Sequence, residues 1–135
     1  GQVVELVGYS LRLPEGATRV RPGDTLHLTL VWRCLGPMDT SYTVFTHLLD
    51  QANQIRGQQD NPPLSGTYPT TLWIPGEVVA DTYTLVVDAD APLGAHAIEI
   101  GMYVAETGQR LPVLDSAGQI SGDRILVEQV TVTAD

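Results

Sequence analysis

The sequence predicts an all-β fold: an antiparallel β-sandwich, immunoglobulin-like or jelly-roll-like, with about seven to nine strands. Two observations support this prediction. Apolar and polar residues alternate with a period of two in most segments, and no segment sustains a helical stripe. Thirteen glycines and nine prolines separate these segments, as the turns between short strands require. We therefore expect a single sandwich domain over residues 1–135.

The expected strands follow one another along the whole chain. The clearest is TLHLTLVWR at 25–33, where Leu26, Leu28, Leu30 and Trp32 alternate with the neighbouring residues and predict one buried face. Turn signals such as RPGD, WIPGE, DAPLGA and ETGQ separate the segments. In chain order, the strands are expected at 3–13, 25–33, 42–50, 82–90, 96–104 and 125–133.

The charge and the basic residues exclude several classes of function. The formal net charge of −9 argues against nucleic acid and against anionic membrane surfaces as partners. All seven basic residues are arginine, so mechanisms that use a lysine Schiff base or a P-loop lysine are excluded. Cys34 is the single cysteine and can form no internal disulfide; its apolar surroundings predict a buried, inert thiol.

The sequence also carries expectations about the rest of the protein. No stretch reaches the roughly 18 apolar residues that a membrane span needs, and no signal peptide opens the chain. The first residues, GQVVELVGYS, begin without methionine, and we expect the chain to be a piece of a longer protein.

Two similar segments, LDQANQIRG at 49–57 and LDSAGQISG at 114–122, raise the possibility of an internal repeat. The similarity does not extend beyond them, as a structural repeat would. Asp50 and Asp115 fit the first position of a turn, and Asn53 and Gly118 fit a left-handed fourth position. A calcium loop would need more carboxylates at alternate positions. We therefore predict the same kind of hairpin turn in both places.

The segment 60–81, DNPPLSGTYPTTLWIPGEVVAD, is unusually long for a loop, and within it only TTLWI could form a short strand. Two interpretations remain open. Tyr68 and Trp73 could present rings to a sugar, with Asp60, Glu77 and Asp81 accepting hydrogen bonds at the rim. Alternatively, the segment is a crossover strapped over one edge of the sandwich, with Trp73 packed as a plug.

The histidines do not form a motif with a known chemistry. His47 lies in the middle of an expected strand, and we predict a buried ring that meets a carboxylate, with Asp60 the leading candidate. The spacing of His27, His47 and His96 does not match a zinc site, and no G-x-S-x-G nucleophile motif is present. Asp88 and Asp90 could cap a turn or, as the alternative, help to bind calcium. No metal, cofactor or catalytic residue is expected.

A set of short motifs runs through residues 42–115. The motif residues are His47-Leu48-Leu49-Asp50, Asp60, Pro62, Pro63, Gly66, Tyr68, Pro69, Thr70, Trp73, Pro75, Gly76, Glu77, Asp81, Gly101, Tyr103 and Arg110-Leu111-Pro112. In these residues the segment resembles a family of domains found at the C-terminal end of bacterial multi-spanning glycosyltransferases that are similar to dolichyl-phosphate-mannose protein mannosyltransferases. One departure is visible: the family's Gly-x-Tyr is Gly94-Ala95-His96 here, so no role is predicted for an aromatic ring at that position.

The resemblance implies an extracytoplasmic module in the cell envelope that lacks the transferase chemistry and belongs to a membrane protein. We expect a non-catalytic accessory module that recognises glycan or polypeptide, in which His47 and Arg110 are structural polar residues. Two alternatives remain: a carbohydrate-binding module that uses Trp73 and Tyr68, and a protein-binding or protease-inhibitor-like sandwich. The ligand, the strand order and the oligomeric state are not predicted.

Overall fold

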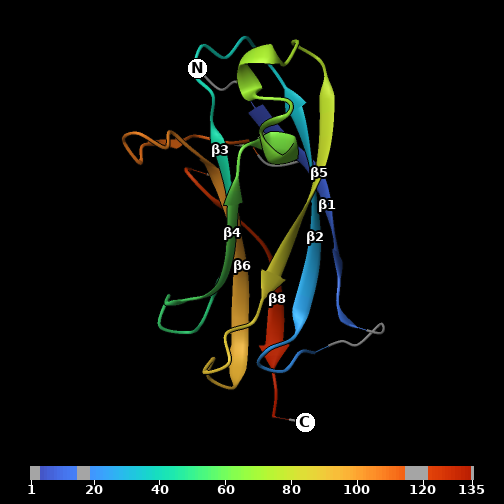
Figure 1. The fold of residues 1–135 in the computed structure, drawn as a ribbon, viewed down its shortest axis with the longest axis vertical. Coiled ribbons are helices and arrows are strands. Elements are labelled where there is room, and N and C mark those ends of the chain that lie inside the picture. The colour runs from blue at the N-terminus through green and yellow to red at the C-terminus, as the bar shows by residue number, and fades with distance from the viewer. Residues whose placement is uncertain (1–3, 15–18, 115–121, 135) are drawn as a thin grey trace.

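The computed structural model describes residues 4–14, 19–114 and 122–134 and consists of two packed β-sheets (Figure 1). Sheet A has the strand order β1-β2-β5. Sheet B has the order β4-β3-β6, and β7 and β8 both pair with β6. Every strand pair is antiparallel. The all-β sandwich is therefore confirmed, with eight strands in the described residues.

The strands follow one another along the chain, and the connections between them differ in length. Two 3₁₀ helices, η2 and η3, fill the connection between β4 and β5. None of the helices in the described ranges is long and apolar enough to span a membrane. The elements are β1 (Val4–Arg12), β2 (Thr25–Cys34), β3 (Thr43–Leu49), β4 (Ile55–Asn61), η2 (Pro63–Gly66), η3 (Thr70–Leu72), β5 (Val78–Val86), β6 (Gly94–Tyr103), β7 (Arg110–Leu111) and β8 (Ile125–Val132).

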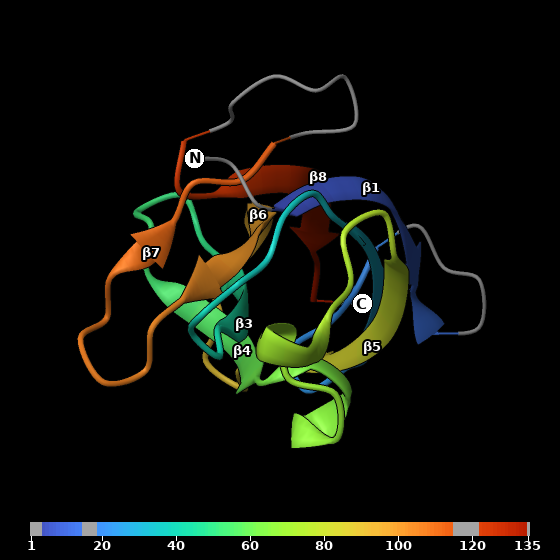
Figure 2. The same cartoon turned by 90° about the horizontal axis from the view of Figure 1, so that it is seen from above.

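The core lies between the two sheets, where the inner faces of the strands meet (Figure 2). In β2 every second residue is buried, which confirms the alternation expected from Leu26 to Trp32. Ile98, Ile100 and Met102 of β6 oppose this row from sheet B and are fully buried. Burying a side chain of this size stabilises the fold by about 1.5–3 kcal/mol. The thiol of Cys34 is buried in the same core, as predicted.

The β3–β4 hairpin confirms one half of the predicted turn pair. Asn53 has a φ of 60°, in the left-handed region, and its N–H donates to the carbonyl oxygen of Asp50 at 3.0 Å. The Asp50 side chain accepts the N–H groups of Ala52 and Gln54 at 2.8 and 2.9 Å. Asp115 and Gly118, the corresponding residues of the second segment, lie outside the described residues.

The sheets approach each other closely where β4 and β5 form the adjacent edges. A Cβ atom added to Gly57 of β4 would lie 2.8 Å from the carbonyl oxygen of Val86, so glycine permits this approach. Beyond the strand ends, the N–H of Asp88 donates to the carbonyl oxygen of Arg56 at 2.8 Å. The N–H of Thr84 donates to the side-chain oxygen of Gln59. The sandwich is therefore nearly closed along this edge.

The connection between β4 and β5 differs from the sequence-based expectation. The loop is shorter than 60–81, because β4 extends to Asn61 and β5 begins at Val78. The possible strand at TTLWI does not form, since Thr70–Leu72 is a 3₁₀ helix. The N–H groups of Leu72 and Trp73 donate to the carbonyls of Pro69 and Thr70, at 2.9 and 3.1 Å, instead of to a neighbouring strand.

Candidate functional site

Trp73 is a plug at one end of the sandwich and not a platform for a sugar ring. Its side chain is only 4% exposed and belongs to the hydrophobic core. The indole N–H donates to the carbonyl oxygen of Tyr68 at 3.1 Å, and the two rings lie 6.5 Å apart between centroids. The ligand-binding role proposed for Trp73 is therefore incorrect, because a buried face cannot stack on a sugar.

Tyr68, Glu77 and Asp81 hold the same connection in place. The Tyr68 hydroxyl donates to the Glu77 carboxylate at 2.7 Å, and the N–H of Ile74 donates to it at 2.9 Å. The hydrogen bonds from Ile74 and Tyr68 lower the pKa of Glu77, and the bond to Glu77 raises the pKa of Tyr68. Asp81 accepts the N–H of Leu64, a residue in left-handed backbone, at 2.7 Å. These acceptors are occupied by the protein itself.

Asp60 lies elsewhere, on the outer face of sheet B, in a cluster that the sequence revealed only in part. Strand register brings the cluster together: His47 of β3 is opposite Gln58 of β4 and Glu99 of β6. Phe45, two residues earlier, is opposite Asp60 and Gly101. We call this group the His47 cluster; it consists of His47, Asp60, Glu99, Arg110 and Arg124.

Glu99 is the centre of the His47 cluster. Its Oε2 lies 2.8 Å from Nδ1 of His47, and its Oε1 lies 2.9 Å from Nη1 of Arg124 and 3.7 Å from Nη1 of Arg110. The His47 Nε2 lies 3.4 Å from Oδ1 of Asp60, which is long for a hydrogen bond. His47 is 8% exposed, so its predicted burial beside a carboxylate is confirmed. Asp60 is present as expected, but Glu99 is the closer partner.

Mutual charge stabilisation controls the ionisation of this cluster. Burial by itself lowers the pKa of His47, but Asp60 and Glu99 outweigh burial and raise the pKa above its ordinary 6.5. Burial likewise raises the pKa of Asp60 and of Glu99, yet the nearby cations leave both below their ordinary values. Both carboxyl groups are therefore ionised at neutral pH, and neither has the raised pKa that a general acid needs.

An aromatic side chain supports the cluster from beside it. The Phe45 ring is 1% exposed, lies 5.0 Å from the His47 ring and carries the Arg110 guanidinium 4.3 Å above its centre. A Cβ on Gly101 would lie 2.5 Å from the ring, so the glycine allows Phe45 to lie flat over β6. The Arg110 guanidinium gains a cation–π contact as well as its ion pair. The structural role predicted for Arg110 agrees with these contacts.

A hollow of about 270 Å³ opens on this face of sheet B. Tyr103 donates to Oδ2 of Asp60 at 3.1 Å, while Oδ1 of Asp60 is buried and accepts no hydrogen bond from the described residues. Gln58 and Ile55 are exposed, Ile55 by 45%. The lining therefore combines hydrogen-bonding groups with a small apolar surface. The lining residues are Phe45, His47, Ile55, Gln58, Asp60, Tyr103, Gly108 and Arg110.

The histidines and acids do not assemble a metal site in the ranges described. No group of three or more His, Cys, Asp and Glu side chains there is placed to hold a metal ion. His27 belongs to sheet A, and His47 and His96 belong to sheet B. Asp90 lies 3.8 Å from Arg56 of the β3–β4 hairpin and forms an ion pair with it.

Comparison with known proteins supports the fold. No protein-family model matches the sequence, and no curated protein matches it. The crystal structure of the C-terminal domain of Wzt superimposes with a TM-score of 0.66 at 9% identity, covering 100% of this chain and 76% of that one. A β-glucosidase from Listeria innocua in complex with glucose reaches a TM-score of only 0.45 at 11% identity, over 93% of this chain and 16% of that one. The chain thus shares its β-sandwich fold with a known C-terminal domain.

Proposed function

We propose that this chain is a non-catalytic recognition module that binds glycan in the hollow on the outer face of sheet B. The observation that carries the proposal is the hollow itself, where a fixed set of donors and acceptors surrounds a small apolar surface. Sugars present the same combination of hydroxyl groups and apolar ring faces. A volume of about 270 Å³ lies near the lower end of the roughly 300–1,000 Å³ typical of ligand sites, which suits one or two sugar residues.

The polar groups of the hollow are already oriented before a ligand arrives. His47 and Asp60 are held by the ion pairs of the cluster, and Tyr103 is held by Asp60. Ligand binding therefore orders few side chains, which lowers the entropic cost of association. Gln58 is exposed at the rim and adds both a donor and an acceptor.

The same groups favour binding over catalysis. The lining contains no serine, threonine, cysteine or lysine nucleophile. Nδ1 of His47 lies 2.8 Å from Glu99 and Nε2 faces Asp60 at 3.4 Å, so both ring nitrogens point toward carboxylates and not toward a nucleophile. We therefore propose that any transferase or hydrolase chemistry belongs to other parts of the parent protein.

A glycan titration on a matched pair of variants tests the proposal. Gln58→Ala removes hydrogen-bonding groups from the rim and should weaken glycan binding by about tenfold, the effect of one good hydrogen bond. Gln129→Ala removes an exposed glutamine from β8 of the same sheet, away from the hollow, and should leave affinity unchanged. A glycan panel that shows no binding to the unaltered protein, or equal binding by both variants, would overturn the proposal.

A group of exposed apolar side chains also favours polypeptide as a second candidate ligand. Leu35, Leu72, Ile74 and Val78 are 40%, 58%, 65% and 50% exposed. They gather at one end, because the backbone of Cys34 is hydrogen-bonded to Gly76 and Glu77. In the full parent protein, a photo-cross-linking residue in place of Ile74 should then capture polypeptide, whereas one in place of Gln129 should not. Equal capture at both positions would remove this candidate.

The cell-envelope location belongs to the proposal as well. It is supported by the resemblance of residues 42–115 to C-terminal domains of membrane glycosyltransferases. Protease added to intact cells that express the parent protein, after opening of the outer layers, should cleave an extracytoplasmic module. Protection of the module until the inner membrane is lysed would contradict this location.

A further inference from the structure

The arginines fall into two groups that differ in whether they have a carboxylate partner. The chain has 16 acidic residues against seven arginines, so carboxylates are in excess. Arg33, Arg56, Arg110 and Arg124 each have a carboxylate within 4.0 Å. In the part of the chain that the structure describes, the guanidinium groups of Arg12, Arg19 and Arg21 have no ion pair and no hydrogen bond.

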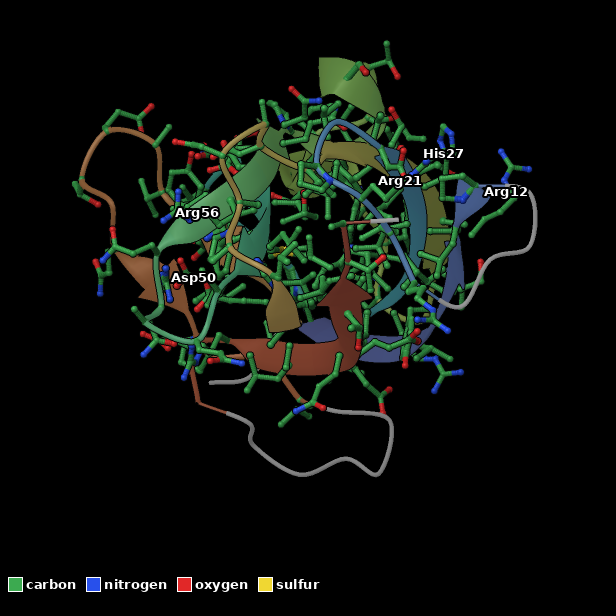
Figure 3. The ribbon with its side chains drawn as sticks, turned by 90° about the horizontal axis from the view of Figure 1, so that it is seen from below. Arg12, Arg21, His27, Asp50 and Arg56 are labelled. Atoms are coloured by element: carbon green, nitrogen blue, oxygen red, sulfur yellow. The ribbon has the colours of Figure 1, made fainter. Side chains whose placement is uncertain are left out.

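The unpaired arginines gather at one end of sheet A. Arg12 is the last residue of β1 and is the cross-strand partner of His27. Arg21 lies in the turn that leads into β2, and Figure 3 shows Arg12, Arg21 and His27 on one side of the molecule, across from Asp50 and Arg56. Arg19 precedes Val20, which bridges to Val132 at the end of β8. Arg12 and Arg21 therefore reach the same region of the molecule from separate parts of the chain.

A hollow of about 560 Å³ lies in the same place. Its one described carboxylate, Asp24, is engaged in the turn, because its Oδ2 accepts the backbone N–H of Arg21 at 2.9 Å. The guanidinium of Arg12, the imidazole of His27 and the hydroxyl of Thr25 supply donors. The hollow is lined by Arg12, Leu13, Pro14, Gly23, Asp24, Thr25 and His27.

We propose that this hollow binds a phosphate group, either free or on a lipid head group. A guanidinium donates two parallel hydrogen bonds to phosphate, and Arg12 lines the hollow. Arg21 belongs to the turn whose Gly23 and Asp24 line the hollow, so it adds a second positive charge beside it. The net charge of −9 opposes anion binding at long range. Charges more than about 8 Å away are largely screened at physiological salt, so the local excess of arginine controls a bound anion. This site is on sheet A and is independent of the glycan site on sheet B.

Titration with sodium phosphate tests the site, with sodium chloride used to keep the ionic strength constant. We expect saturable changes in the NMR signals of the Arg12 and Arg21 Nε–H groups. In the Arg12→Ala/Arg21→Ala double variant, binding should weaken by tenfold or more. Arg33→Ala is the matched control, since Arg33 lies at the opposite end of β2 and pairs with Glu5, and it should bind as the unaltered protein does.

Asp24→Asn, in the lining of the same hollow, should change the affinity for phosphate in the opposite direction. Asparagine keeps an oxygen that can accept the Arg21 N–H, but it removes one negative charge, so phosphate should bind more tightly. Equal changes with chloride alone, or unchanged affinity in the double variant, would overturn the proposal. These outcomes do not depend on whether the sheet B hollow binds glycan.

Vesicles distinguish the two sources of phosphate. Vesicles with phosphatidylglycerol in phosphatidylcholine should sediment the protein more than pure phosphatidylcholine vesicles if a lipid supplies the group, and the double variant should abolish the difference. Saturable binding of free phosphate without sedimentation would support a soluble phosphate compound. Absence of both effects would refute the site.

Discussion

Nδ1 of His47 lies 2.8 Å from Oε2 of Glu99, across the adjacent strands β3 and β6, on the outer face of a sheet. The side chain of Glu99 is only 6% exposed although it does not face the core between the sheets. A buried carboxylate of this kind depends on its cationic partners for solvation. Two expectations about stability follow, one on substitution and one on pH.

Glu99→Gln should destabilise the fold by about 3 kcal/mol, because His47 and Arg124 lose the charge that compensates their partial burial. Urea denaturation at neutral pH measures the change. Glu128→Gln is the control: Glu128 is exposed on β8 and accepts only the hydroxyl of Tyr9, so its replacement should have a small effect. Equal losses for the two variants would contradict a special role for Glu99.

The His47 cluster also predicts a pH dependence whose sign follows from the pKa directions. The pKa of His47 is raised in the folded state, so its contribution is fully present below the unfolded value of 6.5. That contribution is lost as the pH rises through the folded pKa. The depressed pKa values of Asp60 and Glu99 act oppositely: their contribution is present above 3.8 and 4.5 and is lost as the pH falls through the folded values.

Stability should therefore decrease from pH 6 to pH 8 in the unaltered protein, and His47→Gln should remove most of this decrease. The free energy of unfolding from urea denaturation at several pH values measures both curves. If the two proteins lost stability in parallel over this interval, a group other than His47 would be responsible.

Trp73→Ala should lower the free energy of unfolding by about 3–5 kcal/mol, as for other buried aromatic residues, because the plug leaves a cavity. Trp73→Phe should cost less, since it fills most of the space but cannot donate to the Tyr68 carbonyl. Thermal denaturation measures both, and glycan affinity of the folded fraction should not change. A stable Trp73→Ala protein that had lost glycan binding would restore the sugar-platform interpretation.

Gly101→Ala should destabilise the protein by about 1–3 kcal/mol, because the added Cβ would lie 2.5 Å from the Phe45 ring. The ring must move, and the Arg110 contact above it is disturbed. Gly8→Ala is the matched control, since a Cβ at Gly8 would meet no atom within 4 Å. Comparable effects of the two substitutions on the melting temperature would show that Phe45 adapts freely.

Sequence periodicity predicted six of the strands because half-buried strands alternate visibly. It missed β4, Ile55–Asn61, whose sequence IRGQQDN is polar. This strand pairs only with β3, so it needs little apolar surface, and its Gly57 is required by contact with Val86 and not by a turn. β7 was missed because two residues carry no period.

The candidate site was harder to predict than the fold. His47 and Asp60 were paired from the sequence, but the closer partner, Glu99, lies 52 residues from His47 along the chain. Its signal in the sequence was a single acidic residue within the apolar strand HAIEIGMYV. Such a residue indicates that the outer face of the strand carries a carboxylate that needs a cationic partner. Which cation satisfies it depends on strand register, and the sequence does not encode register in a readable form. The sequence left both interpretations of Trp73 open, the buried plug and the sugar platform, until its burial was known.

The contact between Gly57 and Val86 has a consequence for how this module behaves at high local density. Sheets with free edges recruit strands from neighbouring molecules and polymerise. Here the amides of Thr84 and Asp88 already donate to the opposing segment. Because Gly57 has no side chain, β4 and β5 approach so closely that little room remains between them for an incoming strand. Many copies can therefore be crowded side by side without joining into fibres through this edge.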